Sequence, residues 1–137
     1  VSLVFSYAYV DAGTSTELYN FDWGVNLPAG SALVNVPKNS ANFMLTKDFS
    51  VNETDASLGF SVNYVDDRLG ETIDPSYRLP EYTLFNVFGS YKLNEQTQLS
   101  MHIDNLFDEK HYLSSYHKWW TTPGSPISYT LGVNYEF

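Results

Sequence analysis

Apolar and polar residues alternate along most of this chain with a period of two. The clearest run lies at its end, where one set of alternate positions is apolar and the other is polar or small. The apolar set is Ile127, Tyr129, Leu131, Val133, Tyr135 and Phe137, and the other is Ser128, Thr130, Gly132, Asn134 and Glu136. Successive side chains of a β-strand point to opposite faces, so this period is typical of strands. No sustained 3.6-residue period appears, and the pattern predicts an all-β fold.

The alternation recurs in five earlier stretches and predicts six strands in all. They are expected at 1–11, 40–50, 56–67, 80–93, 97–105 and 125–137. The connections alternate in length: those at 12–39, 68–79 and 106–124 are long, whereas those at 51–55 and 94–96 are short. Long loops at one end and tight turns at the other are typical of a transmembrane antiparallel β-barrel. A soluble β-sandwich gives no reason to expect this asymmetry.

The polar faces of these strands suit a water-filled lumen. They carry mainly Ser, Asn, Gln, Gly and Thr, with few charged residues in mid-strand. The predicted strands are about 9–13 residues long, which is enough for a tilted strand to cross a hydrocarbon core of about 30 Å. Tyrosines near the strand ends (Tyr9, Tyr64, Tyr91 and Tyr135) predict an interfacial girdle.

Lys47 is the exception, because it shares the parity of Phe43, Leu45 and Phe49. Its ammonium could extend to the lipid headgroups, or a β-bulge could turn it inward.

An open sheet in a membrane would leave unpaired backbone groups at its edges, each costing several kcal/mol. Six strands are also fewer than the usual minimum of about eight for a closed barrel. Either the chain is part of a larger barrel, or the membrane interpretation is wrong.

Composition excludes several other classes of protein. The chain has 137 residues, no Cys and a formal net charge of −9. It therefore has no disulfide framework or thiolate site, and it lacks the basic face that binding to nucleic acid requires. No apolar run approaches the roughly 18 residues of a transmembrane helix. The first residue is Val1 rather than Met, which indicates a mature form or a fragment.

The segment "NLFD" follows the fifth predicted strand and comprises Asn105, Leu106, Phe107 and Asp108. Asn and Asp tolerate left-handed backbone conformations and cap turns with their side chains. We expect them to end the strand at the long-loop rim, with Leu106 and Phe107 seating the turn against the barrel wall. A strand-end turn of any β protein is the alternative interpretation.

The chain resembles one family through five segments. They are "SYAYVDA" at 6–12, "GSALVNVPKNSANF" at 30–43, "LPEYTLFNVFGSY" at 79–91, "NLFDEKHY" at 105–112 and "PGSPISYTLGVNYEF" at 123–137. Their order and spacing are similar to the last six strands of TonB-dependent outer-membrane receptors, and among these of the siderophore receptors. The barrel of that family has roughly 22 strands.

The resemblance implies that residues 1–137 are the C-terminal part of the barrel domain, without the plug domain or TonB box. It implies an outer-membrane location in a Gram-negative bacterium, periplasmic short turns and external long loops. Expected partners are the plug domain, outer-membrane lipid, the barrel assembly machinery, and the TonB complex through the missing N-terminal region. The whole protein would import a ferric siderophore as its transported ligand, with no cofactor and no enzyme activity. This segment alone is expected to transport nothing.

The last strand also resembles the insertion signal of outer-membrane barrels, which ends on an aromatic residue. The residues that carry this signal are Tyr129, Leu131, Val133, Tyr135 and Phe137. The alternative is the last strand of any sheet that happens to end on Phe. A long apolar edge strand on a soluble protein would, however, promote aggregation.

Aromatic residues in the first and third long connections are the candidate ligand-binding residues. They are Tyr19, Phe21 and Trp23 in the first, and Tyr112, Tyr116, His117, Trp119 and Trp120 in the third. Aromatic rings with a few polar groups suit a bulky, partly planar chelate. Alternatively, Trp119 and Trp120 belong to an interfacial belt or pack within the loops.

Metal sites are weaker hypotheses, and no catalytic signature appears. His102 and Asp104 share one strand face but lack a third ligand, which favours polar residues of the lumen. His111 and His117 have no convincing ligand spacing. Four carboxylates of the second long connection could bind Ca²⁺, although a solvated acidic rim is the simpler interpretation. These are Asp66, Asp67, Glu71 and Asp74.

Two other functions remain open from the sequence. The first is a TonB-dependent receptor or porin for another solute, such as a cobalamin or an oligosaccharide. The second is a soluble β-sandwich or lipocalin-like binding module. Dependence on detergent separates the soluble module from the membrane protein.

Overall fold

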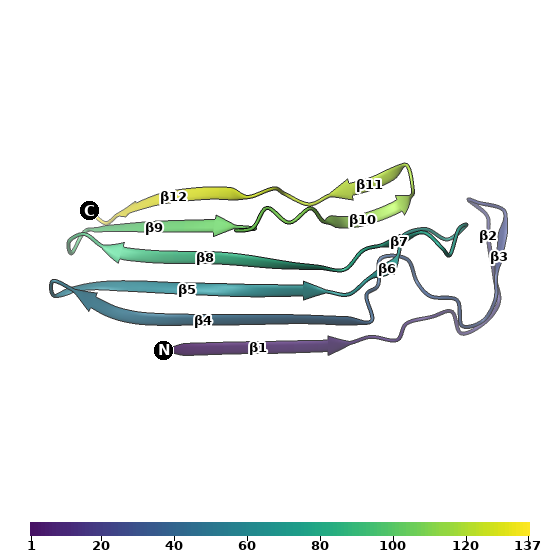
Figure 1. Cartoon of the computed structure of the whole chain (residues 1–137), viewed down its shortest axis with the longest axis horizontal. Helices are drawn as coiled ribbons and strands as arrows, with labels where there is room; N and C mark the ends of the chain where they lie inside the picture. Colours follow the sequence, from purple (N-terminus) through teal and green to yellow (C-terminus); the bar gives the residue numbers. More distant parts are fainter.

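Six long strands form one antiparallel sheet in the computed structural model, which describes all 137 residues (Figure 1). The strands are β1 (Ser2–Tyr9), β4 (Asn39–Val51), β5 (Thr54–Val65), β8 (Tyr82–Lys92), β9 (Thr97–Asp104) and β12 (Ser128–Tyr135). Each strand pairs with the next long strand along the chain, in the order β1-β4-β5-β8-β9-β12. The six predicted strands are thus confirmed, with ends that differ by a few residues. No helix is long and apolar enough to cross a membrane.

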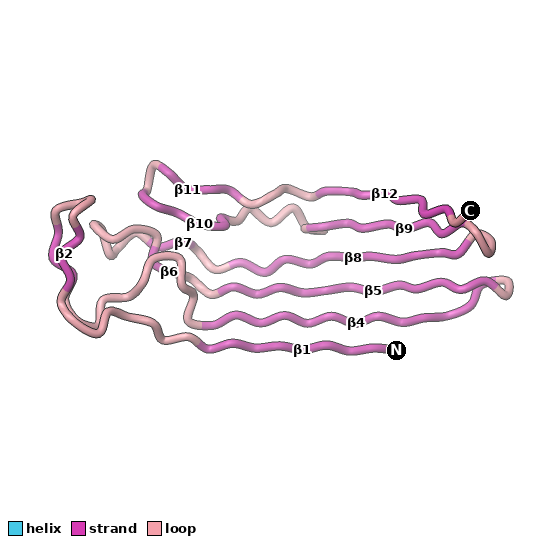
Figure 2. The backbone as a smooth tube through the Cα atoms, turned by 180° about the vertical axis from the view of Figure 1, so that it is seen from behind, coloured by secondary structure: helices cyan, strands magenta, loops and turns pink.

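Three short hairpins lie beyond the end of the sheet that is opposite both termini (Figures 1 and 2). They pair β2 (Leu18–Asn20) with β3 (Val25–Leu27), β6 (Arg68–Leu69) with β7 (Arg78–Leu79), and β10 (Tyr112–His117) with β11 (Trp120–Pro123). The sequence predicted these segments only as loops, and this was wrong. Strands of two to six residues are too short to produce a recognisable alternation.

The register preserves the two faces predicted from the alternation. On one face, Phe43 lies opposite Phe5 on β1 and Val62 on β5, and Val62 lies opposite Phe85 on β8. On the other face, Ser57 and Ser90 are cross-strand partners whose hydroxyl oxygens lie 2.8 Å apart. Each strand therefore contributes most of its apolar side chains to the same surface of the sheet, although Met44, Leu84 and Phe88 lie on the other face.

The sheet has almost no core of its own. Only ten of the 137 residues are buried, and Ala56, Leu69 and Leu79 are the only apolar ones. A globular domain of this size would bury a continuous cluster of apolar side chains between two layers. Here Phe5, Leu58 and Leu131 are 63%, 52% and 80% exposed. The apolar face therefore needs a covering that lies outside the chain.

The β4–β5 pairing decides between the two interpretations of Lys47. Partners run without interruption from Ser40 opposite Val65 to Val51 opposite Thr54, with Lys47 opposite Leu58. The interpretation that a β-bulge turns Lys47 inward is therefore wrong, and Lys47 stays on the apolar face. The turn that follows has positive φ at Asn52 (51°) and Glu53 (65°), as in a two-residue type I′ hairpin.

Candidate functional site

The three long connections pack against one another to form one assembly at the rim. Asn35, in the first, has a left-handed φ of 64°. Its backbone N–H donates to the backbone carbonyl of Leu69 in the second connection at 2.9 Å. Its side chain donates to the Ser115 carbonyl in the third at 2.7 Å and accepts from the Ser115 amide at 2.8 Å. One asparagine therefore links all three connections.

Arg68 holds the second connection to the third. The side-chain Nη2 donates to the carbonyls of Tyr112 at 2.5 Å and Leu113 at 3.0 Å. The residue is only 3% exposed, and its guanidinium carbon lies 5.6 Å from the centre of the Tyr82 ring. Because a buried charge is costly without partners, these contacts are needed to keep Arg68 in place.

Glu71 makes the second link between these two connections. Its Oε2 accepts a hydrogen bond from the Lys118 amide at 2.7 Å and lies 3.5 Å from His117 Nε2. Glu71 is 1% exposed. The interpretation of Glu71 as part of a solvated acidic rim is therefore wrong, since this carboxylate is an internal acceptor that positions the tip of the third connection.

The other three carboxylates of the second connection each have a separate partner. Asn39 Nδ2 donates to Asp66 at 2.6 Å, and this bond lowers the pKa of Asp66 below its ordinary 3.8. The hydroxyl and amide of Ser76 donate to Asp74 Oδ1, and they lower the pKa of Asp74 in the same way. Asp67 forms an ion pair with the Arg78 guanidinium. The carboxylates face their own partners and do not surround a common point where Ca²⁺ could bind.

Five of the eight candidate aromatic and histidine residues come together around His117. The Trp23 ring, from the first connection, stacks on the His117 ring. The two ring centres are 5.2 Å apart, and the ring planes meet at an angle of 23°. The other ring contacts join Trp23 to Tyr116, Tyr116 to Trp120, and His117 to Trp119 and Trp120, with 5.1–6.2 Å between ring centres. We call Trp23, Tyr116, His117, Trp119 and Trp120 the loop aromatic cluster.

The cluster offers exposed rings around a fixed centre. Trp119 and Trp120 are 81% and 65% exposed, whereas the His117 side chain is 12% exposed. Because Glu71 lies behind His117, the histidine is held in place while the indole rings remain accessible. Such a surface can stack on a planar group and donate hydrogen bonds from the indole nitrogens.

The three remaining candidates lie outside the cluster. Tyr19 and Phe21 form an edge-to-face pair of their own at 4.8 Å, and Phe21 is 87% exposed. Tyr112 contributes its carbonyl to Arg68 and is itself 41% exposed. These residues are accessible at the rim but do not contribute rings to the cluster.

The "NLFD" segment forms a turn that is held by its own side chains. Asn105 and Asp108 both have a left-handed φ of 52°. The Asn105 side chain, 3% exposed, donates to the carbonyls of Glu109 and Ser125 and accepts from the Glu109 amide, at 2.8–3.1 Å. Phe107 packs edge-on against Phe85 at 5.2 Å. The segment therefore ties the end of β9 to the entry of β12.

Replacing Asn105 with Ala is expected to lower the free energy of unfolding of the complete barrel by about 1–3 kcal/mol. The reason is that the variant leaves three backbone groups without their partner in a buried turn. Urea unfolding in lipid vesicles, followed by tryptophan fluorescence, measures the change. Asn94→Ala is the control, because Asn94 is exposed in a short turn and its side chain accepts only the Gln96 amide. Equal losses in the two variants would contradict a special role for Asn105.

The histidines of the metal hypotheses have separate surroundings. His102 stacks on Phe88 at 6.1 Å, on the polar face of the sheet. His111 packs against Tyr82 at 4.7 Å, whereas His117 belongs to the loop aromatic cluster. No group of three His, Asp or Glu side chains in the chain is arranged to hold a metal ion.

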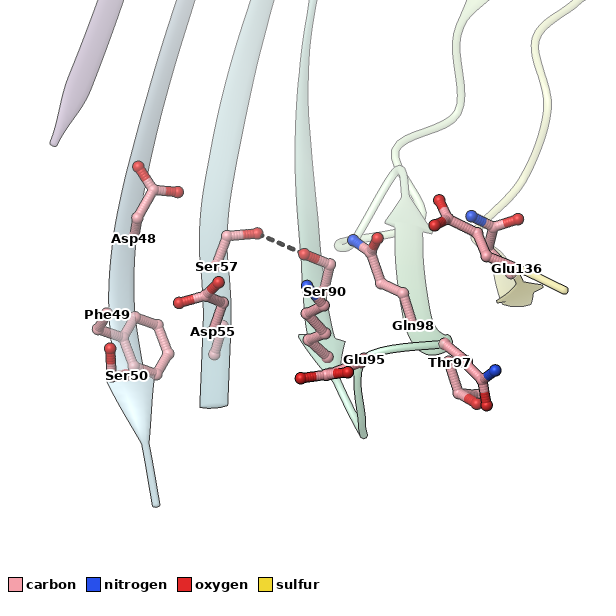
Figure 3. A pocket seen from close by; sticks show the side chains of 14 residues that line it. Asp48, Phe49, Ser50, Asp55, Ser57, Ser90, Glu95, Thr97, Gln98 and Glu136 are labelled. Carbon is pink, nitrogen blue, oxygen red and sulfur yellow. Dashed lines mark hydrogen bonds between the residues drawn. The ribbon is translucent and has the colours of Figure 1, made fainter. Parts of the chain in front are cut away.

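A hollow lies on the polar face of the sheet, at the short-turn end (Figure 3). It has a volume of about 680 Å³. Its lining includes the carboxylates of Asp48, Asp55, Glu95 and Glu136 but only one cation, Lys92. The hollow has the polar lining expected of a lumen, and its charge is acidic.

Sequence reasoning missed the structural roles of the residues that assemble the rim, namely Asn35, Arg68, Glu71 and Ser115. Asn35 alone lies in a segment that carries the family resemblance, and Glu71 was named only as a possible Ca²⁺ ligand or solvated carboxylate. The one available signal was that Asn tolerates a left-handed backbone, which makes Asn35 a candidate turn residue. The partners of these residues could not be inferred because they lie in other connections.

Comparisons with known proteins identify the family. The family model described as "TonB dependent receptor-like, beta-barrel" matches residues 1–106. The chain belongs to this family, and its sheet is a portion of a larger barrel. A curated relative, the metal-pseudopaline receptor CntO of Pseudomonas aeruginosa, is 33% identical over 136 residues, which cover 98% of this chain and 18% of CntO.

Two relatives from Acinetobacter baumannii have solved structures. The siderophore receptor PiuA has a TM-score of 0.78 at 22% identity, covering 97% of this chain and 19% of PiuA. The ferric preacinetobactin receptor BauA has a TM-score of 0.67 at 25% identity, covering 77% of this chain and 16% of BauA. The chain thus spans less than a fifth of the relatives that it matches. The predicted family and barrel fold are confirmed.

Proposed function

We propose that this chain is the last six strands of an outer-membrane receptor that imports a metal–siderophore chelate with energy delivered through TonB. The observation that carries the proposal is the loop aromatic cluster, which presents exposed rings at the rim of a barrel segment 33% identical to the metal-pseudopaline receptor CntO. Metal enters only as part of the transported chelate. The activity is binding and gated passage, without bond chemistry.

The orientation follows from the same proposal. The rim with the three hairpins faces the medium, and the short turns and the acidic hollow face the periplasm. The apolar face meets outer-membrane lipid, while the polar face meets the plug domain and water. The barrel assembly machinery would recognise the last strand through Tyr129, Leu131, Val133, Tyr135 and Phe137.

The cargo is proposed to be a ferric siderophore. A chelate of another metal is the second candidate, because the relative CntO is described as a metal-pseudopaline receptor rather than an iron receptor. The cluster itself does not discriminate between them, since its rings would contact the organic chelator.

Uptake of radiolabelled chelates by cells tests the proposal. Cells with the complete receptor are compared with cells lacking its gene and with cells lacking TonB. We expect uptake of at least one chelate to require both genes, and parallel assays with iron and other transition metals identify the cargo. If deletion of the receptor leaves the uptake of every chelate unchanged and abolishes uptake of a cobalamin or an oligosaccharide, the siderophore proposal is wrong.

A further inference from the structure

Lys47 is the only charged residue on the apolar face of the six-stranded sheet. Cross-strand partners share a face, so the register assigns every strand residue to one side. On β4 the neighbours of Lys47 on this face are Leu45 and Phe49, and its partner on β5 is Leu58. The Lys47 ammonium forms no ion pair within the chain.

A shallow groove of about 510 Å³ surrounds the stem of Lys47. Besides Lys47, its lining is almost entirely apolar and includes Leu45, Phe49, Leu58, Phe60 and Val87. An apolar groove with one cation matches a molecule that combines a hydrocarbon chain with a negative group. Membrane lipids with an anionic headgroup have this combination.

The position of Lys47 along β4 suits such a lipid. Lys47 lies four residues before Val51, where the strand enters its hairpin turn. At about 3.3 Å per residue, the two Cα atoms are about 13 Å apart along the strand. A lysine stem can extend from this depth toward the headgroups while its methylene groups stay in contact with apolar surface.

We propose that this groove binds one acyl chain of an anionic phospholipid from the periplasmic leaflet, whose phosphate pairs with the Lys47 ammonium. The inference depends on the membrane orientation given under the proposed function. A lysine in hydrocarbon is unfavourable when it has no partner, and a phosphate at headgroup level supplies one. A lipid with a net negative charge pairs better than a zwitterionic one, because no headgroup amine competes with Lys47.

Native mass spectrometry of the complete receptor in detergent tests this proposal. Phosphatidylglycerol or phosphatidylcholine is added at equal concentrations, and the fraction of receptor carrying lipid is measured. We expect the wild type to bind phosphatidylglycerol about fivefold more strongly, the effect of one basic residue near an anionic lipid. Lys47→Met should remove this preference.

Lys92→Met is the matched control. Lys92 lies near the same end of the sheet but on the polar face, where it lines the acidic hollow. The control variant should keep the full preference for phosphatidylglycerol. The proposal is overturned if the wild type shows no preference, if Lys47→Met keeps it, or if both variants lose it equally.

The lipid proposal and the proposed function can fail separately. If the wild type shows no lipid preference while chelate uptake is intact, only the lipid site is overturned. If instead the receptor imports no chelate but retains a preference that depends on Lys47, the lipid site stands and the cargo assignment is wrong.

Discussion

Replacing Leu131 with arginine is expected to lower the free energy of unfolding of the complete barrel by about 2–4 kcal/mol. Leu131 lies in the middle of β12, opposite Met101 on β9, and is 80% exposed on the apolar face. If lipid covers this face, the variant places a charge in hydrocarbon. Urea unfolding in lipid vesicles, followed by tryptophan fluorescence, measures the loss.

Thr130→Arg is the control for this experiment. Thr130 is adjacent in the chain but lies on the polar face, opposite His102. An arginine there would face the lumen, so its cost should be well below that of Leu131→Arg. If the two variants lose equal stability, or if Thr130→Arg is the worse, the assignment of the faces to lipid and lumen is wrong.

Replacing Trp23 with Ala is expected to weaken binding of the transported chelate by about thirtyfold, which corresponds to the roughly 2 kcal/mol of an aromatic residue at a binding hot spot. Trp23 stacks on His117 and contacts Tyr116, so it joins the first connection to the third. The variant removes a ring and also releases the two cluster residues that it holds. Quenching of intrinsic fluorescence by the loaded chelate measures the affinity of the purified receptor.

Phe21→Ala serves as the matched control. Phe21 lies two residues before Trp23 in the same connection, is 87% exposed, and its only aromatic ring contact is with Tyr19. Its affinity for the chelate should stay within about twofold of the wild type. Should Phe21→Ala weaken binding as much as Trp23→Ala, the ligand would be contacting the wider rim rather than the loop aromatic cluster.

The sheet was predictable because its signal is local. A period of two places alternate side chains on opposite faces of any strand, so the apolar positions alone indicate which side needs a covering. The "NLFD" turn was predictable for a similar reason, since Asn105 and Asp108 adopt conformations that these residue types favour. Even the position of Lys47 on the apolar face followed from parity, and only the absence of a bulge required the structure.

The arrangement of the rim was not predictable in this way. Asn35 and Ser115 are 80 residues apart in sequence, and Arg68 is 44 residues from Tyr112. Their contacts depend on how three connections of different length fold over the same end of the sheet. The sequence predicted Glu71 as a solvated carboxylate because its partner amide, at Lys118, is 47 residues away.

By itself, the sequence determined that this protein is an antiparallel sheet with one apolar and one polar face, and that its connections differ between the two ends. The tertiary structure alone decided which rings form the loop aromatic cluster, and that a buried arginine and glutamate hold it. The physical reason is the range of the interactions. Alternation acts between neighbouring residues and can be read along the chain, whereas the cluster depends on hydrogen bonds and ring contacts between connections that meet only once the sheet has formed.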